Sequence, residues 1–205
     1  MLASGQVGPI TQGAGLTPGS QPALRLGNQG ELIATQLHGR YYENTYRRGS
    51  FVCASSAPNT TSVASATAAT GLIISNPIGS GVNLAINKVG YVFSVAFAAA
   101  AIIGIACNSS TGTSVIHTAA ATPRQLMIGT PTGALGLVDT SATLPAAAYI
   151  THVLTSIPAA GTGSGIVDLE GSLVLAPGAY AHIYTSTASG ASGFSGFFSW
   201  EEIPI

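Results

Sequence analysis

The carboxylates of this chain are the first residues to test for chemistry, because glycosidases and calcium sites need carboxylates close together. Two pairs are present, Asp168 with Glu170 and Glu201 with Glu202. On a strand, Asp168 and Glu170 would face the same side, whereas Glu201 and Glu202 would point to opposite faces. We expect Asp168 and Glu170 to be structural, bonded to the backbone or to arginine at the entrance of a strand.

Histidine and cysteine do not have the spacing of a metal or redox site. The four histidines and two cysteines are far apart in the sequence: His38, His117, His152, His182, Cys53 and Cys107. Zinc motifs on helices need closely spaced histidines, and redox motifs need a Cys-x-x-Cys pair. The glycine-rich run 161–165 lacks the lysine of a phosphate loop and is predicted to be a loop. We therefore predict no enzyme, no metal, no cofactor and two buried thiols.

Charge is scarce in this sequence, which has 6 Lys and Arg residues and 7 Asp and Glu residues among 205. A typical share of charged residues is about 25%, and a soluble monomer normally keeps its surface charged. Either partners cover much of the surface or the chain lies in a membrane. The net charge of −1 gives no strong attraction to nucleic acid.

The stretch 89–107 is the one long enough to span a bilayer, with 19 residues and no charge. Its large side chains fall on alternate positions, at Val89, Tyr91, Phe93, Val95 and Phe97. Period two is the pattern of a strand, and a helix would scatter these side chains around its axis. We predict a buried strand with a bulge or turn within 98–101, in preference to a membrane helix or a buried helix.

The rest of the chain divides into an arm and a β domain. Residues 1–36 are rich in Gly, Pro, Gln and Thr and are predicted to form an extended arm. Residues 37–205 alternate short apolar runs with turn residues, which predicts an all-β, jelly-roll-like sandwich. The expected strands are 51–55, 71–75, 81–87, 89–107 in one or two pieces, 114–119, 124–129, 147–155, 171–176, 180–187 and 197–203.

The clearest expected hairpin runs over 171–185, around Pro177 and Gly178. This pair suits a type II turn, because proline fixes φ and glycine adopts positive φ. The strand after the turn would place Tyr180, His182 and Tyr184 on one face.

The segment 40–48 combines three tyrosines with three arginines, a mixture enriched at interface hot spots. Three interpretations stay open: an ordinary first strand with a solvated face, a protein–protein anchor, or a nucleic-acid site, which no wider basic surface supports. The residues proposed to contact a partner are those of this segment together with an arginine of the arm: Arg25, Arg40, Tyr41, Tyr42, Tyr46, Arg47 and Arg48.

Three runs carry a resemblance to a known group of proteins. They are Glu-Leu-Ile-Ala-Thr-Gln-Leu-His-Gly-Arg-Tyr-Tyr-Glu at 31–43, Asp-Leu-Glu-Gly-Ser-Leu-Val-Leu-Ala-Pro-Gly at 168–178 and Trp-Glu-Glu-Ile-Pro at 200–204. Their order resembles small structural proteins of tailed bacteriophages with jelly-roll domains, among them trimeric capsid decoration (cement) proteins. The three runs cover 29 residues, toward the two ends of the chain.

The resemblance implies a virion structural protein that is made in the host cytoplasm and lies on the capsid surface. It implies a homotrimer whose arm and Tyr/Arg segment bind the major capsid protein, with no nucleic acid and no membrane as partner. A rival interpretation is a receptor- or glycan-binding fibre head, which would expose aromatic residues at an outer tip, such as Tyr149, Tyr180, Tyr184 or Trp200.

Overall fold

The computed structural model describes residues 40–55, 57–129, 133–189 and 193–205. The predicted arm 1–36, its boundary with the β domain and Arg25 lie outside the described residues. The described elements are α1 Tyr42–Tyr46, β1 Ser50–Ala54, β2 Ala68–Ser75, β3 Val82–Phe93, β4 Ala101–Ser109, β5 Ile116–Ala121, β6 Arg124–Gln125, β7 Leu137–Thr143, β8 Tyr149–Ile157, β9 Gly163–Leu175, β10 Ala179–Thr185 and β11 Phe194–Pro204.

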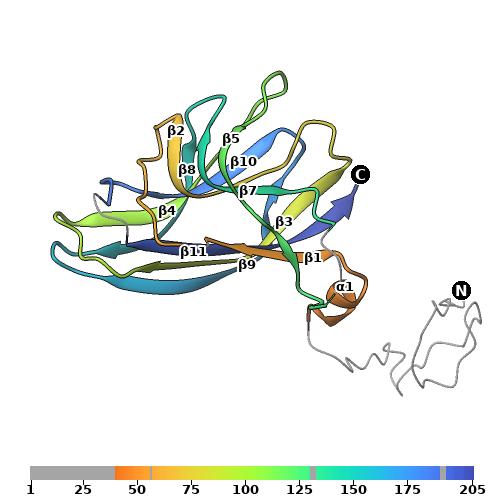
Figure 1. Cartoon of the computed structure of the whole chain (residues 1–205), viewed down its shortest axis with the longest axis horizontal. Coiled ribbons are helices and arrows are strands. Elements are labelled where there is room, and N and C mark those ends of the chain that lie inside the picture. The colour runs from red at the N-terminus through yellow and green to blue at the C-terminus, as the bar shows by residue number, and fades with distance from the viewer. Residues whose placement is uncertain (1–39, 56, 130–132, 190–192) are drawn as a thin grey trace, which may run out of the picture. The chain divides into compact units, whose positions relative to one another are not determined.

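The strands form two antiparallel sheets that pack face to face, as the two layers in Figure 1 show. The first sheet has the order β6-β1-β11-β3-β9, and the second has the order β5-β7-β2-β10-β4-β8. The prediction of an all-β sandwich is confirmed. The strands follow from the period-two patterns, because alternate side chains on each strand enter the space between the sheets.

The core between the sheets is built from large aromatic and aliphatic side chains. On β11, Phe194, Phe198 and Trp200 point into this space and are completely buried. They pack with Ile103 and Ile105 of β4, in the second sheet. Complete burial of such side chains is the main favourable term in the stability of a sandwich of this size.

The stretch 89–107 forms strands, as predicted, but its division differs from the expectation. β3 runs without a break from Val82 to Phe93 and therefore joins two runs that were expected to be separate strands. The chain then leaves the sheet over 94–100, a longer interruption than the turn predicted within 98–101, and re-enters at β4. A bulge near Asn87 lets β3 keep its core-facing pattern on both sides.

The predicted 171–185 hairpin is wrong, although its turn is right. The amide of Ala179 donates to the carbonyl of Ala176 at 2.9 Å, and Gly178 has a φ of 87°, as a type II turn requires. However, β9 pairs with β3 in the first sheet, whereas β10 lies between β2 and β4 in the second. The turn therefore carries the chain from one sheet to the other, because turn residues fix a local reversal and not the partner of each strand.

Two smaller predictions are also corrected. The glycine-rich run 161–165 is not entirely a loop, because β9 already begins at Gly163 and its glycines face the Tyr91 region of β3. The strand expected over 124–129 is reduced to Arg124–Gln125, and 126–129 form a turn. In both cases long-range pairing overrides local composition.

Candidate binding surface

The Tyr/Arg segment is a short helix held against the start of β1, not the ordinary first strand that was one interpretation of it. The amide of Thr45 donates to the carbonyl of Tyr41 at 3.0 Å, and the amide of Gly49 donates to the carbonyl of Asn44 at 3.0 Å. The Asn44 side-chain amide donates to the hydroxyl of Ser50 at 3.1 Å. These bonds fix the segment at the entrance to the sandwich.

The helix presents aromatic and basic side chains to solvent. Tyr42 and Tyr46 are 44% and 43% exposed, and their rings stack with centroids 5.9 Å apart. Arg40, Arg47 and Arg48, close to them in the sequence, are exposed as well. A preordered aromatic pair flanked by guanidinium groups loses little side-chain entropy on binding and suits a protein-binding anchor.

The side chain of Tyr41 contacts the outer face of the first sheet and connects the segment to it. Its hydroxyl donates to Asp168 Oδ1 at 3.3 Å, and Lys88 Nζ lies 5.7 Å from the centre of its ring. Lys88 also pairs with Asp168 at 3.7 Å. Lys88 was not among the predicted site residues, because nothing in its local sequence shows that β3 would place it opposite Asp168.

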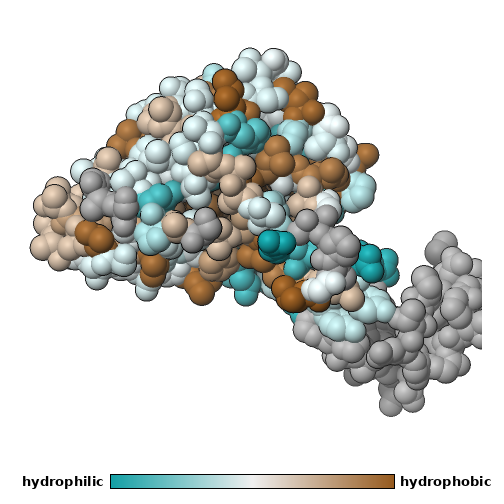
Figure 2. All heavy atoms as spheres, viewed as in Figure 1, coloured by the Kyte–Doolittle hydropathy of each residue, from teal (hydrophilic) through white to brown (hydrophobic). Residues whose placement is uncertain are grey.

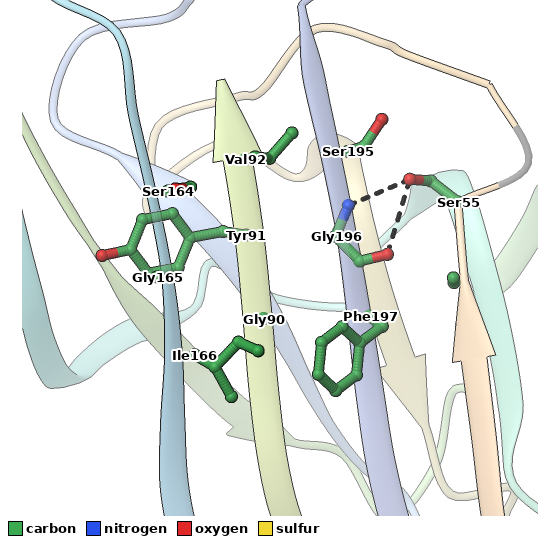
Figure 3. A pocket seen from close by; sticks show the side chains of 11 residues that line it. Ser55, Gly90, Tyr91, Val92, Ser164, Gly165, Ile166, Ser195, Gly196 and Phe197 are labelled. Atoms are coloured by element: carbon green, nitrogen blue, oxygen red, sulfur yellow. Dashed lines mark hydrogen bonds between the residues drawn. The ribbon is translucent and has the colours of Figure 1, made fainter. Parts of the chain in front are cut away.

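A groove lies next to this contact on the same outer face (Figure 3). It has a volume of about 440 Å³. One row of its lining crosses the sheet, where Ala54 pairs with Phe197, Phe197 with Gly90, and Gly90 with Ile166. The groove therefore crosses four strands at right angles to them, a width of about 14 Å at the usual strand spacing.

Glycines and apolar side chains line the groove. A side chain at Gly90 would collide with the ring of Phe197 on the neighbouring strand. Ile166 and Val92 stand beside it, 70% and 41% exposed. Hydroxyl groups occur at the rim, and the residues that line the groove include no charged group. Such a lining fits an uncharged, aliphatic partner.

The middle of the outer face of the second sheet is different, because the chain covers it with one of its own connections. Tyr180 and Tyr184 of β10 lie in a second apolar cluster, apart from the core between the sheets. Leu144 and Ala148, the first and last residues of the connection between β7 and β8, belong to that cluster. The Tyr180 hydroxyl donates to the carbonyl of Ala146 in this connection at 2.6 Å. This closes the face around the tyrosines.

This covering contradicts most of the expected aromatic tip. Tyr180, Tyr184 and Trp200 are 0%, 2% and 0% exposed, and only Tyr149 of the four is open to solvent, at 61%. Tyr149 borders a hollow of about 410 Å³ that Tyr184, Ile102 and Ile150 also line.

His182 lies between Tyr180 and Tyr184 on β10 and is completely buried. Burial lowers the pKa of its imidazole to about 4, and hydrogen bonding to the backbone of Ala64 and Ile183 opposes part of that shift. The ring is therefore neutral at pH 7.

The carboxylates accept hydrogen bonds from other groups of the protein. Asp168 accepts a hydrogen bond from the amide of Glu170 at 3.1 Å, so the expected bond to the backbone is confirmed. One oxygen of Glu202 accepts from the Trp200 indole at 3.2 Å and from the amides of Leu135 and Gly136 at 2.8 and 2.9 Å. Glu201 accepts from Asn87 at 3.1 Å.

His117 and Asp139 form a contact that sequence spacing did not indicate. The two residues lie on neighbouring strands, β5 and β7, with His117 Nδ1 2.6 Å from Asp139 Oδ2. Asp139 is completely buried and His117 is partly exposed. No cluster of three or more histidine, cysteine or acidic residues suited to a metal ion occurs in the part of the chain that the structure describes.

The two cysteines are free and buried, as predicted. Burial raises the pKa of the Cys53 thiol to about 11, with a smaller contribution from Asp139, and burial also raises the pKa of Cys107. Neither thiol is a nucleophile at neutral pH. Among the described residues, no helix is long and apolar enough to cross a bilayer.

Comparison of the chain with protein-family models, with curated proteins and with solved structures gives no match. The fold and its surfaces are therefore interpreted from their own geometry. Figure 2 shows the visible face as a mixture of weakly polar and apolar residues, with strongly hydrophilic residues confined to small areas. Such a surface is unusual for a protein that stays separate from its neighbours.

Proposed function

We propose that this chain is a structural subunit of a tailed-bacteriophage virion and has no enzymatic role. It assembles in the host cytoplasm as a homotrimer of jelly-roll-like domains and binds the major capsid protein at the capsid surface. The arm 1–36, with Arg25, and the Tyr/Arg segment are the capsid anchor.

The observation that carries this proposal is the exposed, stacked pair of Tyr42 and Tyr46 on the short helix before β1, with Arg47 and Arg48 next in the sequence. Few residues of the chain are charged, and this supports a protein whose surface is covered by other subunits. The structural use of the carboxylates and the raised thiol pKa values give no support to an enzyme.

The mechanism is mechanical. An arm that crosses the seam between capsid subunits adds buried area there, and this resists the outward pressure of the packaged genome. Each arm alone binds weakly, because ordering it costs conformational entropy. Three arms on one oligomer raise the effective concentration of one another at the capsid, which increases the overall affinity about 10²- to 10⁴-fold.

Sedimentation with capsids tests the proposal. Deletion of 1–36 should leave a folded oligomer that no longer pellets with capsids lacking the chain. The double substitution Tyr42→Ala and Tyr46→Ala should weaken binding at least 10-fold, since hot-spot tyrosines contribute about 2 kcal/mol or more each. Tyr149→Ala is the matched control, because this exposed tyrosine lies on β8 and outside the anchor. Full binding by the deletion variant would refute the proposed anchor.

One specific observation supports a second candidate function, a glycan-binding fibre head. The exposed Tyr149 borders a hollow with Tyr184 and the hydroxyl residues Ser65 and Ser186, and aromatic rings beside hydroxyl groups can hold a sugar. Binding of the wild-type chain on a glycan array, abolished by Tyr149→Ala, would favour this function over capsid binding.

A further inference from the structure

A hollow of about 410 Å³ lies on the outer face of the second sheet, beside the exposed Tyr149. Its volume is in the range of roughly 300–1,000 Å³ that small-molecule sites have. The described residues that line it include no charged group, and their only polar side chains are hydroxyls: Ala64, Ser65, Ile102, Ala148, Tyr149, Ile150, Tyr184 and Ser186. The lining therefore suits a neutral molecule that carries both apolar surface and hydroxyl groups.

Tyr180 and Tyr184 lie on the same face of β10 but differ in what their hydroxyl groups bind. The Tyr180 hydroxyl donates to the carbonyl of Ala146 at 2.6 Å, and this bond opposes part of the rise that burial causes in its pKa. Tyr184 is 2% exposed, burial alone raises its pKa, and its hydroxyl has no hydrogen-bond partner among the described residues. A buried hydroxyl that lacks a partner lowers stability. Because Tyr184 lines the hollow, water or a ligand hydroxyl can supply the missing partner there.

Gly104 on the neighbouring strand β4 allows the Tyr184 ring to lie against the sheet. A Cβ atom at Gly104 would come within 2.6 Å of Tyr184 Cε1 and 3.0 Å of its hydroxyl oxygen. The ring therefore extends from β10 over β4, and the next strand is β8, which carries Tyr149. Packed in this way, the ring has a fixed position before a ligand binds, which reduces the entropy that binding costs.

Hydrogen bonds also fix the other sides of the hollow. The hydroxyl oxygen of Ser186 accepts from the amide of Ile102 at 2.9 Å, so its proton stays available for a ligand. The loop that carries Ser65 is tied to β10, because the amide of Thr185 donates to the carbonyl of Ser62 at 3.3 Å. Tyr149, 61% exposed at the start of β8, offers an open aromatic face.

A pyranose sugar has the surfaces that this hollow requires. The C–H groups on one face of its ring are apolar and can stack on an aromatic side chain such as Tyr149. Its hydroxyl groups donate and accept hydrogen bonds, as the hydroxyls of tyrosine and serine do. An acidic sugar would lose the hydration of its carboxylate without meeting a cation, which is unfavourable. A nucleobase pairs best with side-chain amides or charged groups, and the described lining has neither.

We propose that the hollow binds one neutral pyranose residue of a glycan, with the apolar face of the sugar on the Tyr149 ring and one sugar hydroxyl bonded to the Tyr184 hydroxyl. The inference rests on the second candidate function, and it names the class of ligand and the side chain that selects it. It makes no use of the capsid anchor.

Saturation-transfer NMR on the purified full chain tests the class of ligand. The probes are the methyl glycosides of glucose, galactose, mannose and N-acetylglucosamine, together with those of glucuronic and galacturonic acid. The wild type should bind at least one neutral glycoside at millimolar concentration and neither acid, since the hollow lacks a cation. Failure of every neutral glycoside to bind, or equal binding of an acid, would overturn the inference.

Two substitutions that each remove a single hydroxyl group give the decisive comparison. Tyr184→Phe should weaken binding of the neutral glycoside about 10-fold, the value of one hydrogen bond. Its urea midpoint should not fall, because the hydroxyl has no partner in the chain. Tyr180→Phe is the matched control on the same face of β10. It should keep the affinity and lower the urea midpoint, because it loses the bond to Ala146. Full affinity of Tyr184→Phe would overturn the inference.

Substitutions of Tyr149 test the stacking contact. Tyr149→Ala should abolish binding of the neutral glycoside, whereas Tyr149→Trp should keep it, because the indole also offers an aromatic face. Tyr149 is exposed, so both variants should unfold at the wild-type urea midpoint. Full affinity of Tyr149→Ala would place the sugar elsewhere and overturn the inference.

Other outcomes separate the inference from the functions on which it bears. A wild type that binds glycans on an array, with full binding by both Tyr184→Phe and Tyr149→Ala, would leave the fibre-head function standing and overturn this site. A wild type that binds no glycan would overturn both. Pelleting with capsids should be the same for the wild type and Tyr184→Phe, and its loss in the variant would assign the hollow to the capsid contact instead of a sugar.

Discussion

The two outer faces of this sandwich belong to sheets of similar size, yet they differ in whether the chain covers their large apolar side chains. On the second sheet, Tyr180 and Tyr184 are buried beneath the loops around Leu144 and Ala148. On the first sheet, Ile166 and Val92 stand open beside a groove. Covering a large apolar side chain on a sheet face removes it from water, and this stabilises the folded protein. The tyrosines of the second face are therefore stabilised by their own chain, whereas the apolar side chains beside the groove remain in contact with solvent.

The difference has a consequence for stability. The covered tyrosines add to the free energy of unfolding of the chain, whereas the exposed side chains beside the groove add little. Substitutions at the covered tyrosines should thus affect stability more than those beside the groove.

Tyr180→Ala gives the largest effect and the strongest test of this comparison. It removes a completely buried ring and its bond to Ala146, and we expect the free energy of unfolding to fall by about 3–5 kcal/mol. Val92→Ala on the open face should change it by less than about 1 kcal/mol. Urea unfolding of both variants measures the two values, and similar losses would contradict the comparison.

Acid should weaken the covered face through His182. Its pKa in the folded chain is about 4, below the ordinary value of 6.5, so the unfolded chain binds the proton more readily between these values. Stability from this group is complete above pH 6.5, falls as the pH drops, and is lost by pH 4. The gap between the two pKa values corresponds to about 3 kcal/mol.

Unfolding measured at pH 7, 5.5 and 4 checks this expectation. His182→Gln is the control, because glutamine keeps a neutral polar side chain without a proton to gain in this range. The difference in pH dependence between the wild type and the variant isolates His182 from other titrating groups. Parallel curves would show that the buried imidazole does not sense acid.

Gly90→Val tests the open face of the first sheet. The new side chain would collide with the ring of Phe197 and force it from its place. We expect a loss of about 1–3 kcal/mol in stability, because the ring must move. Urea unfolding measures this loss, and a stability equal to that of the wild type would show that the ring of Phe197 moves aside at no cost.

Asp168→Asn should have the smallest effect. Asp168 pairs with Lys88, and the two side chains are 42% exposed, so solvent screens the attraction. We expect less than about 1 kcal/mol, decreasing further with salt. Thermal unfolding at low and high salt measures this, and a loss above 2 kcal/mol would show that Tyr41 and this pair hold the helix more tightly than their exposure indicates.

The amino-acid sequence by itself determined the secondary structure class and the core positions of single strands. The alternation at Val89, Tyr91 and Phe93 predicted three side chains that the structure buries. The apolar surroundings of Cys53 and Cys107 predicted buried thiols correctly. These signals succeed because a strand repeats every two residues, so a few neighbouring residues contain the whole pattern.

For the binding surface, sequence drew attention to Tyr42 and Tyr46 by composition but did not predict their helix. That helix depends on bonds from Asn44 to Gly49 and Ser50, which close only when β1 is in place. The groove gave no sequence signal, because Ala54, Gly90, Ile166 and Phe197 meet only through pairing between distant strands.

Tertiary structure alone decided which sheet each strand joins. Pro177 and Gly178 made a turn predictable, but the partners of β9 and β10 were fixed by packing on opposite sides of the core. The cover over His182 and the contact of His117 with Asp139 were settled in the same way. The physical reason is range: side-chain alternation acts over neighbouring residues, whereas sheet order depends on burying faces that are far apart in the chain.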